Sequence, residues 1–117
     1  MRKLIIGLLL VSALAVAGIA SAHPAVTTLT GTVGPEDTIT LTSAGHKVTA
    51  LKAGAYTIVI HDLANDHNFH LVGPGVAKTT SVGGTGTVVW HVKLKHGTYN
   101  YVCDPHANFM HGRVSVR

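Results

Sequence analysis

Cysteine is almost absent from this sequence: among 117 residues, the only one is Cys103. A single cysteine cannot form an intramolecular disulfide, so the disulfide frameworks that stabilise many small exported domains are excluded. The thiol therefore serves either as a small buried hydrophobic group or as a metal ligand. Its neighbours favour a metal ligand, because His106 follows three residues later and Met110 follows seven residues later.

Charged residues are also scarce, at 12% of the sequence. No basic run and no basic cluster with interleaved aromatic residues occurs, so the sequence lacks the pattern that dense phosphate contacts require. We therefore predict no nucleic-acid binding. No Ser-His-Asp grouping or pair of carboxylates points to a catalytic site, and we do not expect an enzyme.

The longest apolar run lies at the N-terminus. Arg2 and Lys3 precede an uncharged stretch from residue 4 to residue 20, and the small residues at positions 20 to 22 are typical of a signal-peptidase site. We expect residues 1–22 to be a secretory signal peptide and the protein to be periplasmic or secreted. The alternative is an uncleaved membrane anchor, since the run is at the short end of what spans a bilayer.

Residues 23–117 then form one domain, which we expect to be monomeric. Arg2 and Lys3 account for two of the nine basic residues, so the domain keeps seven basic and five acidic residues, a net charge of +2. This mild excess is weak evidence for an acidic docking partner. The membrane would be a partner only through an uncleaved N-terminal segment.

The domain sequence is dominated by Val, Thr, Ile and Tyr in short runs separated by Gly and Pro, with no sustained helical period. This pattern predicts an all-β chain, and about eight short strands are typical of a two-sheet sandwich. The expected strands cover residues 26–33, 38–42, 46–51, 56–62, 68–72, 79–82, 85–94, 98–103 and 112–117.

Alternation along these strands predicts which side chains face inward. Tyr99, Tyr101 and Cys103 share one face, which directs the thiol toward the interior end of its strand. His67 shares a face with the apolar Phe69, whereas His70 points the opposite way, so His67 is the better partner for Cys103.

A short pattern occurs twice, at residues 51–56 and 94–99: Leu, two residues, Gly, one residue, Tyr. In β-sandwiches, a tyrosine corner uses such a hydroxyl to bond the backbone a few residues upstream. We therefore interpret Tyr56 and Tyr99 as structural residues.

Four side chains could converge on one metal ion: His67, Cys103, His106 and Met110. A thiolate and two imidazoles in a plane, with a weak axial thioether, suit copper that cycles between its two oxidation states. A rigid β scaffold would hold a compromise geometry, so electron transfer would require little rearrangement. We predict one type 1 copper ion, with zinc held by the Cys and the two His as an alternative.

These residues resemble the type 1 copper proteins of the plastocyanin and azurin family, the cupredoxins. The match runs from about residue 51 to residue 116, and its landmarks are Gly54, Tyr56, His67, Asn68, Gly97, Tyr99, Cys103, Pro105, His106, Met110 and Gly112. The resemblance implies a Greek-key sandwich, His67 as the first imidazole ligand, and Asn68 as the residue that ties that segment to the cysteine loop. Such outer residues orient the ligands.

The loop between His106 and Met110 departs from the pattern. It has three intervening residues, where plastocyanins and pseudoazurins have four and amicyanins have two. At the plastocyanin spacing the axial position would be His111; we favour Met110, because sulfur is the usual weak axial donor. Val102 stands where plastocyanins carry an outward Tyr, so that docking route does not transfer.

The predicted function is that of an exported one-electron carrier. The resemblance implies that electrons pass through His106 to and from redox partner proteins. The alternative is a periplasmic copper-binding protein for storage, sensing or delivery. His23 would become the terminal residue after cleavage, and a second copper site there stays open. The remaining histidines, apart from those discussed above, are expected to be solvated: His46, His61, His91 and His96.

Overall fold

The computed structural model describes residues 11–21 and 23–117, and within that part the fold is built from strands. The elements are β1 (Thr27–Val33), β2 (Ile39–Ser43), β3 (His46–Lys47), β4 (Ala50–Leu51), β5 (Gly54–Asp62), β6 (His70–Gly73), β7 (Val76–Thr79), β8 (Gly86–Leu94), β9 (Gly97–Val102), the 3-10 turn η1 (Asp104–His106) and β10 (His111–Val116). The prediction of an all-β chain is confirmed.

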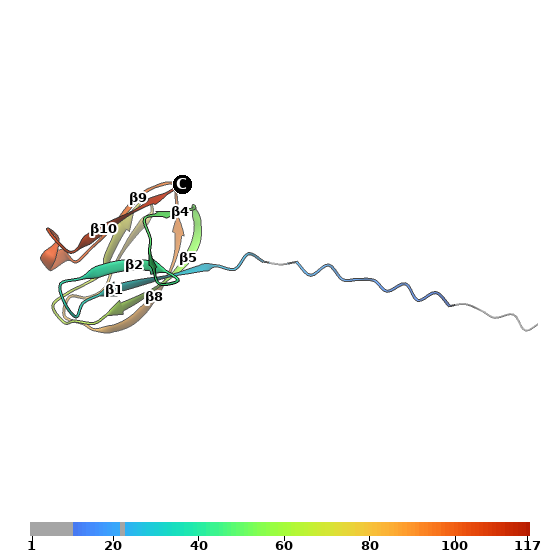
Figure 1. The fold of residues 1–117 in the computed structure, drawn as a ribbon, viewed down its shortest axis with the longest axis horizontal. Coiled ribbons are helices and arrows are strands. Elements are labelled where there is room, and N and C mark those ends of the chain that lie inside the picture. Colours follow the sequence, from blue (N-terminus) through green and yellow to red (C-terminus); the bar gives the residue numbers. More distant parts are fainter. Residues whose placement is uncertain (1–10, 22) are drawn as a thin grey trace, which may run out of the picture.

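The strands form a two-sheet sandwich (Figure 1). One sheet has the order β3-β2-β1-β5-β8, and the other has the order β4-β10-β9-β6-β7. β1 pairs with β5 in parallel, and β10 pairs with β4 in parallel. The core lies between the sheets, where Leu29 and Ile58 from the first sheet and Tyr99 and Val114 from the second are buried.

Two predicted strands were wrong in their extent. Residues 46–51 form two short strands in different sheets, because the buried Val48 turns inward and bonds the Leu41 carbonyl between them. The strand expected at 79–82 is instead β7, which forms a hairpin with β6 across a turn in which Gly75 has a φ of 72°. A positive φ is readily adopted by glycine.

Both tyrosine corners are present. The Tyr56 hydroxyl donates to the Lys52 carbonyl at 2.7 Å. The Tyr99 hydroxyl accepts from the Lys95 N–H at 2.9 Å and donates to the Pro74 carbonyl at 2.6 Å, so it also ties the β8–β9 turn to the β6–β7 turn. The prediction that these two tyrosines are structural agrees with these bonds.

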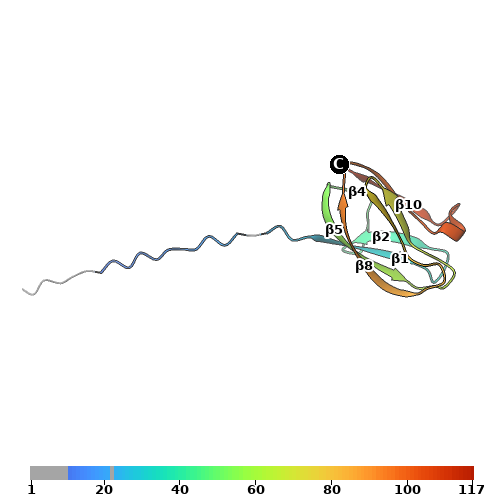
Figure 2. The same ribbon diagram turned by 180° about the vertical axis from the view of Figure 1, so that it is seen from behind.

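The loops at the two ends of the sandwich differ in content. The η1 end consists of residues 34–38, 63–69, 80–85 and 103–110, which connect the strands at the end where β5 and β9 finish. The opposite end, called here the N-terminal end, holds the turns at residues 44–45, 52–53, 74–75 and 95–96. Figure 2 shows the N-terminal segment leaving on the side away from η1.

In the described residues no helix is long and apolar enough to cross a membrane. Residues 11–21 carry no regular secondary structure and are exposed. Residues 1–10 and residue 22, which belong to the predicted signal peptide, lie outside the described residues, so the cleavage after residue 22 stays a prediction.

Candidate metal centre

The loop after β9 brings three candidate ligands together through its own backbone. Cys103 precedes η1, and its carbonyl accepts the His106 N–H at 3.0 Å. The His106 carbonyl then accepts the Met110 N–H at 2.9 Å, and the Met110 carbonyl accepts the Cys103 N–H at 3.0 Å. These hydrogen bonds fold the loop back on itself. They therefore hold Cys103, His106 and Met110 close together before β10 begins.

His67 completes the group from the β5–β6 loop. Its Nδ1 lies 3.7 Å from Cys103 Sγ, His106 Nδ1 lies 3.6 Å from the same sulfur, and the two Nδ1 atoms are 3.0 Å apart. A circle through these three atoms has a radius of about 2 Å, close to ordinary metal–nitrogen distances of about 2.0–2.1 Å. The donor atoms and their spacing therefore fit a metal ion, and the predicted convergence of these three residues is observed.

His67 and His106 both direct the same ring nitrogen, Nδ1, toward the candidate metal centre. With both Nδ1 atoms directed inward, metal binding requires the ring protons to be on Nε2. His67 Nε2 has two carboxylates nearby: Asp37 Oδ1 at 3.6 Å and Asp66 Oδ1 at 3.8 Å. These distances are too long for hydrogen bonds, but the negative charges favour the Nε2 proton and so leave Nδ1 free to bind.

Burial separates the candidate ligands into enclosed and accessible ones. Cys103 is 0% exposed, and His67 and Met110 are each 1% exposed. Only His106 is partly exposed, and its ring centroid lies 5.4 Å from that of the exposed Phe109. The centre is thus closed to water except at the His106 edge.

The two residues considered for the axial position have opposite environments. The Met110 side chain is buried in the loop that carries Cys103 and His106. His111 is exposed at the start of β10, opposite Val102 on β9. A side chain on the outer face of the sheet is poorly placed to reach a buried centre, so Met110 is the better candidate for a fourth donor.

Asn68 links the His67 loop to the cysteine loop. Its Oδ1 accepts the Asp104 N–H at 2.7 Å, and its Nδ2 donates to Asp104 Oδ2 at 2.7 Å and to Thr79 Oγ1 at 3.0 Å. The other carboxylate oxygen of Asp104, Oδ1, lies 2.9 Å from His70 Nδ1. These hydrogen bonds join the β5–β6 loop, β7 and η1 directly beside Cys103.

Sequence reasoning missed Asp104 and His70 as parts of this network. It placed His70 correctly outside the centre but expected no partner for it. The available signal was the position of Asp104 next to Cys103, together with the alternation that puts His70 and Asn68 on the same side of their segment.

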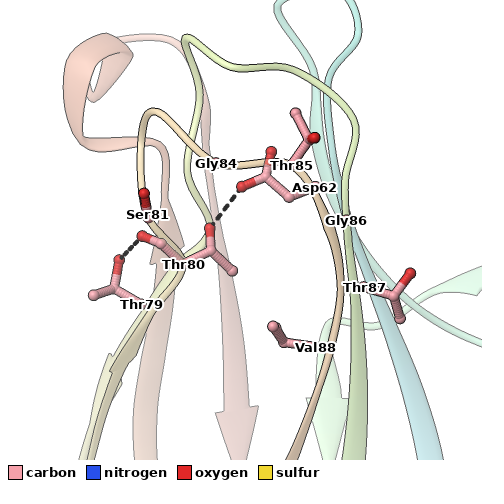
Figure 3. Close-up of a pocket in the computed structure, with 9 residues that line it drawn as sticks. All are labelled: Asp62, Thr79, Thr80, Ser81, Gly84, Thr85, Gly86, Thr87 and Val88. Carbon is pink, nitrogen blue, oxygen red and sulfur yellow. Dashed lines mark hydrogen bonds between the residues drawn. The ribbon is translucent and has the colours of Figure 1, made fainter.

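A second set of hydrogen bonds holds the His67 loop at Phe69. The buried Asp62 carboxylate accepts the Thr80 hydroxyl at 2.9 Å, and Thr80 Oγ1 accepts the Phe69 N–H at 2.8 Å. Figure 3 shows Asp62 and Thr80 at a pocket of about 250 Å³ next to the 80–85 loop. None of the candidate metal ligands lines this pocket. The residues around it therefore affect the metal centre only through the loop positions that these hydrogen bonds fix.

The surroundings shift two pKa values near the centre. The hydrogen bond from His70 lowers the pKa of Asp104, although partial burial opposes this effect. Burial raises the pKa of Tyr101, whose ring stacks on Phe69 with centroids 5.6 Å apart. Asp104 is therefore a carboxylate and Tyr101 a neutral phenol at neutral pH.

We expect Asp104→Asn to remove a pH-dependent part of the stability of the metal-free protein. Because the folded-state pKa of Asp104 is lowered, its contribution is complete above the unfolded pKa of about 4 and is lost as the pH falls through the folded pKa. Since the side chain is half exposed, we expect less than about 1 kcal/mol at pH 7. Urea unfolding of both proteins at neutral and acidic pH measures this; an equal difference at both pH values would contradict it.

The other histidines do not join the centre. His23 is exposed in the extended segment before β1. Among the residues that the structure describes, His67, Cys103 and His106 are the only group of three or more His, Cys, Asp or Glu side chains that could hold a metal ion. A second copper site at His23 stays an open alternative that the structure does not test.

Known proteins share features with this chain. The family described as copper binding proteins, plastocyanin/azurin family, matches residues 25–117. A solved structure of the copper protein rusticyanin aligns with a TM-score of 0.58 and 14% identity over 77% of this chain and 76% of that chain. Rusticyanin from Thiobacillus ferrooxidans aligns with a TM-score of 0.53 and 18% identity over the same shares. No significant match was found among curated protein sequences. At these identities the structural similarity shows a common fold.

Proposed function

This chain belongs to the plastocyanin/azurin family of copper-binding proteins, and from that premise we propose that it is an exported one-electron carrier. Copper is its cofactor, and the donor set of two imidazoles, a thiolate and a thioether suits a type 1 site. We assign His67, Cys103, His106 and Met110 as the ligands. The observation that carries the proposal is the triangle formed by two Nδ1 atoms and one Sγ.

The chain contributes a fixed geometry. Bound copper supplies the exchange of one electron between its two oxidation states. The backbone bonds of the 103–110 loop and the Asn68–Asp104 link hold the ligands in place whether or not the metal changes charge. A site that keeps one geometry in both states requires little reorganisation, which favours fast electron exchange over metal release.

The route for electrons follows from exposure. His67, Cys103 and Met110 are enclosed, whereas His106 reaches the surface beside Phe109. We propose that donor and acceptor proteins approach this edge. No bound substrate or bond-making step is part of the proposal, so we propose no catalytic activity. Export would depend on the predicted signal peptide, residues 1–22.

The test uses residues 23–117 loaded with one equivalent of copper. Voltammetry is expected to give a reversible one-electron wave, and the reduced protein is expected to keep its copper when a strong copper(I) chelator is added. Loss of copper to the chelator upon reduction would instead favour the delivery alternative. A protein that retains copper but gives no reversible wave would contradict the carrier proposal.

A further inference from the structure

The charges of the folded domain are segregated by end. Every carboxylate side chain of the domain lies at or next to the η1 end: Glu36, Asp37, Asp62, Asp66 and Asp104. Five of the seven Lys and Arg residues lie at or near the N-terminal end: Lys47, Lys52, Lys93, Lys95 and Arg117. The other two, Lys78 in β7 and Arg113 in β10, lie in the half of their strand closer to the η1 end. The net charge of +2 therefore conceals two ends of opposite sign.

The exposed carboxylates surround the candidate ligands. Asp37 and Asp66 are 66% and 69% exposed, and both lie within 4 Å of His67 Nε2. Asp104 is 50% exposed and directly follows Cys103. Glu36 is exposed in the turn next to Asp37. Only Asp62 is buried and contributes little to the surface.

Apolar side chains are exposed at the same end. Phe109 is 53% exposed beside His106, and Leu63 is 51% exposed in the loop that carries His67. A patch with apolar contacts and a charged rim is typical of a protein docking surface. The η1 end therefore combines exposed apolar side chains with negative charge at the point where His106 reaches the surface.

We propose that the η1 end docks redox proteins whose contact surfaces are basic. The inference rests on the proposed electron-carrier function and adds the chemistry of the partner. It reverses the weak expectation of an acidic partner that the net charge gave. Charges more than about 10 Å away are screened at about 0.1 M salt, so a docking partner responds to the local carboxylates and not to the distant lysines.

The test compares two small oxidants of opposite charge. The reduced copper protein, residues 23–117, is mixed with cationic tris-phenanthroline cobalt(III) or with anionic hexacyanoferrate(III), and copper oxidation is followed in stopped flow. One electron passes from copper(I) to the oxidant, giving copper(II) and cobalt(II) or hexacyanoferrate(II). From an ionic strength of about 0.01 M to about 1 M, we expect the rate with the cobalt complex to fall by roughly tenfold and the rate with hexacyanoferrate to rise or stay constant.

Matched double variants localise the effect. Glu36→Gln with Asp66→Asn removes two charges at the η1 end, and Lys52→Gln with Lys95→Gln removes two at the N-terminal end. The first pair is expected to abolish most of the salt dependence with the cobalt complex, and the second pair is expected to leave it nearly unchanged. A basic cytochrome c used as electron acceptor is expected to follow the same order.

Two results would overturn this inference in different ways. If the salt dependence follows the net charge, so that hexacyanoferrate slows with salt and the cobalt complex does not, the docking proposal fails while the carrier function stands. If neither oxidant reacts with the reduced protein, the carrier function fails, and the docking proposal fails with it.

Discussion

Cys103→Ala is expected to abolish the intense thiolate-to-copper(II) absorption band completely while leaving the β-sandwich folded. Cys103 is the only thiol in the chain, so no other residue can replace it as a sulfur donor of this kind. Its side chain is fully buried, and its Sγ lies within 3.7 Å of both candidate imidazole nitrogens. Visible spectroscopy with one equivalent of copper(II) measures the loss.

The fold is expected to survive Cys103→Ala because most of the hydrophobic core lies outside the metal centre. The buried apolar residues span both sheets, and only Cys103 and Met110 among them are candidate ligands. We expect the metal-free variant to lose roughly 1 to 3 kcal/mol of unfolding free energy, as for a typical core truncation. Cooperative urea unfolding monitored by Trp90 fluorescence checks this. His61→Ala, which removes an imidazole that bonds Thr87 and is not part of the ligand group, is the control and keeps its colour. A coloured Cys103→Ala protein, or one without a cooperative transition, would contradict the account.

Met110→Leu is expected to keep the intense colour and to raise the reduction potential by at least about 60 mV, a tenfold change in the relative copper affinity of the two states. Met110 is almost fully buried, and Leu has a similar volume, so the core is expected to lose less than about 1.5 kcal/mol. The potential changes because the axial donor and the polarity near the thiolate tune it. Voltammetry gives the value directly.

His111, the exposed residue that follows Met110, provides the matched comparison for this experiment. His111 follows Met110 in the chain but lies on the outer face of β10. We expect His111→Ala to change the potential far less than Met110→Leu does. If Met110→Leu leaves the potential unchanged and His111→Ala shifts it, the axial role belongs to His111 and the assignment is wrong.

The fold class was predictable because it depends on local rules. The meeting of His67 with Cys103, 36 positions away, was predictable from the ligand chemistry of these residues and from the resemblance to the copper proteins. Runs of β-branched residues separated by Gly and Pro predict strands. Alternation decides which face a side chain occupies, and it distinguished His67 from His70. The repeated Tyr pattern likewise predicted the two corners, since a corner involves residues only four positions apart.

Other features depend on contacts between segments that are distant in the sequence. The division of residues 46–51 between two sheets follows from how Val48 packs against the core, which no local pattern reveals. The His70–Asp104 pair joins residues 34 positions apart. The separation of acidic and basic ends appears only once the strand order assigns each loop to an end, so the net charge alone suggested a partner of the opposite sign to the one we propose.

The visible absorption spectrum of residues 23–117 with one equivalent of copper(II) tests directly whether Cys103 binds copper in a type 1 site. We predict an intense blue thiolate-to-copper band that saturates at one copper per chain, because Cys103, His67 and His106 already form a ligand triangle of suitable size. A pale protein without that band would mean that Cys103 does not bind copper(II), and the assignment of a type 1 electron-transfer site would be wrong.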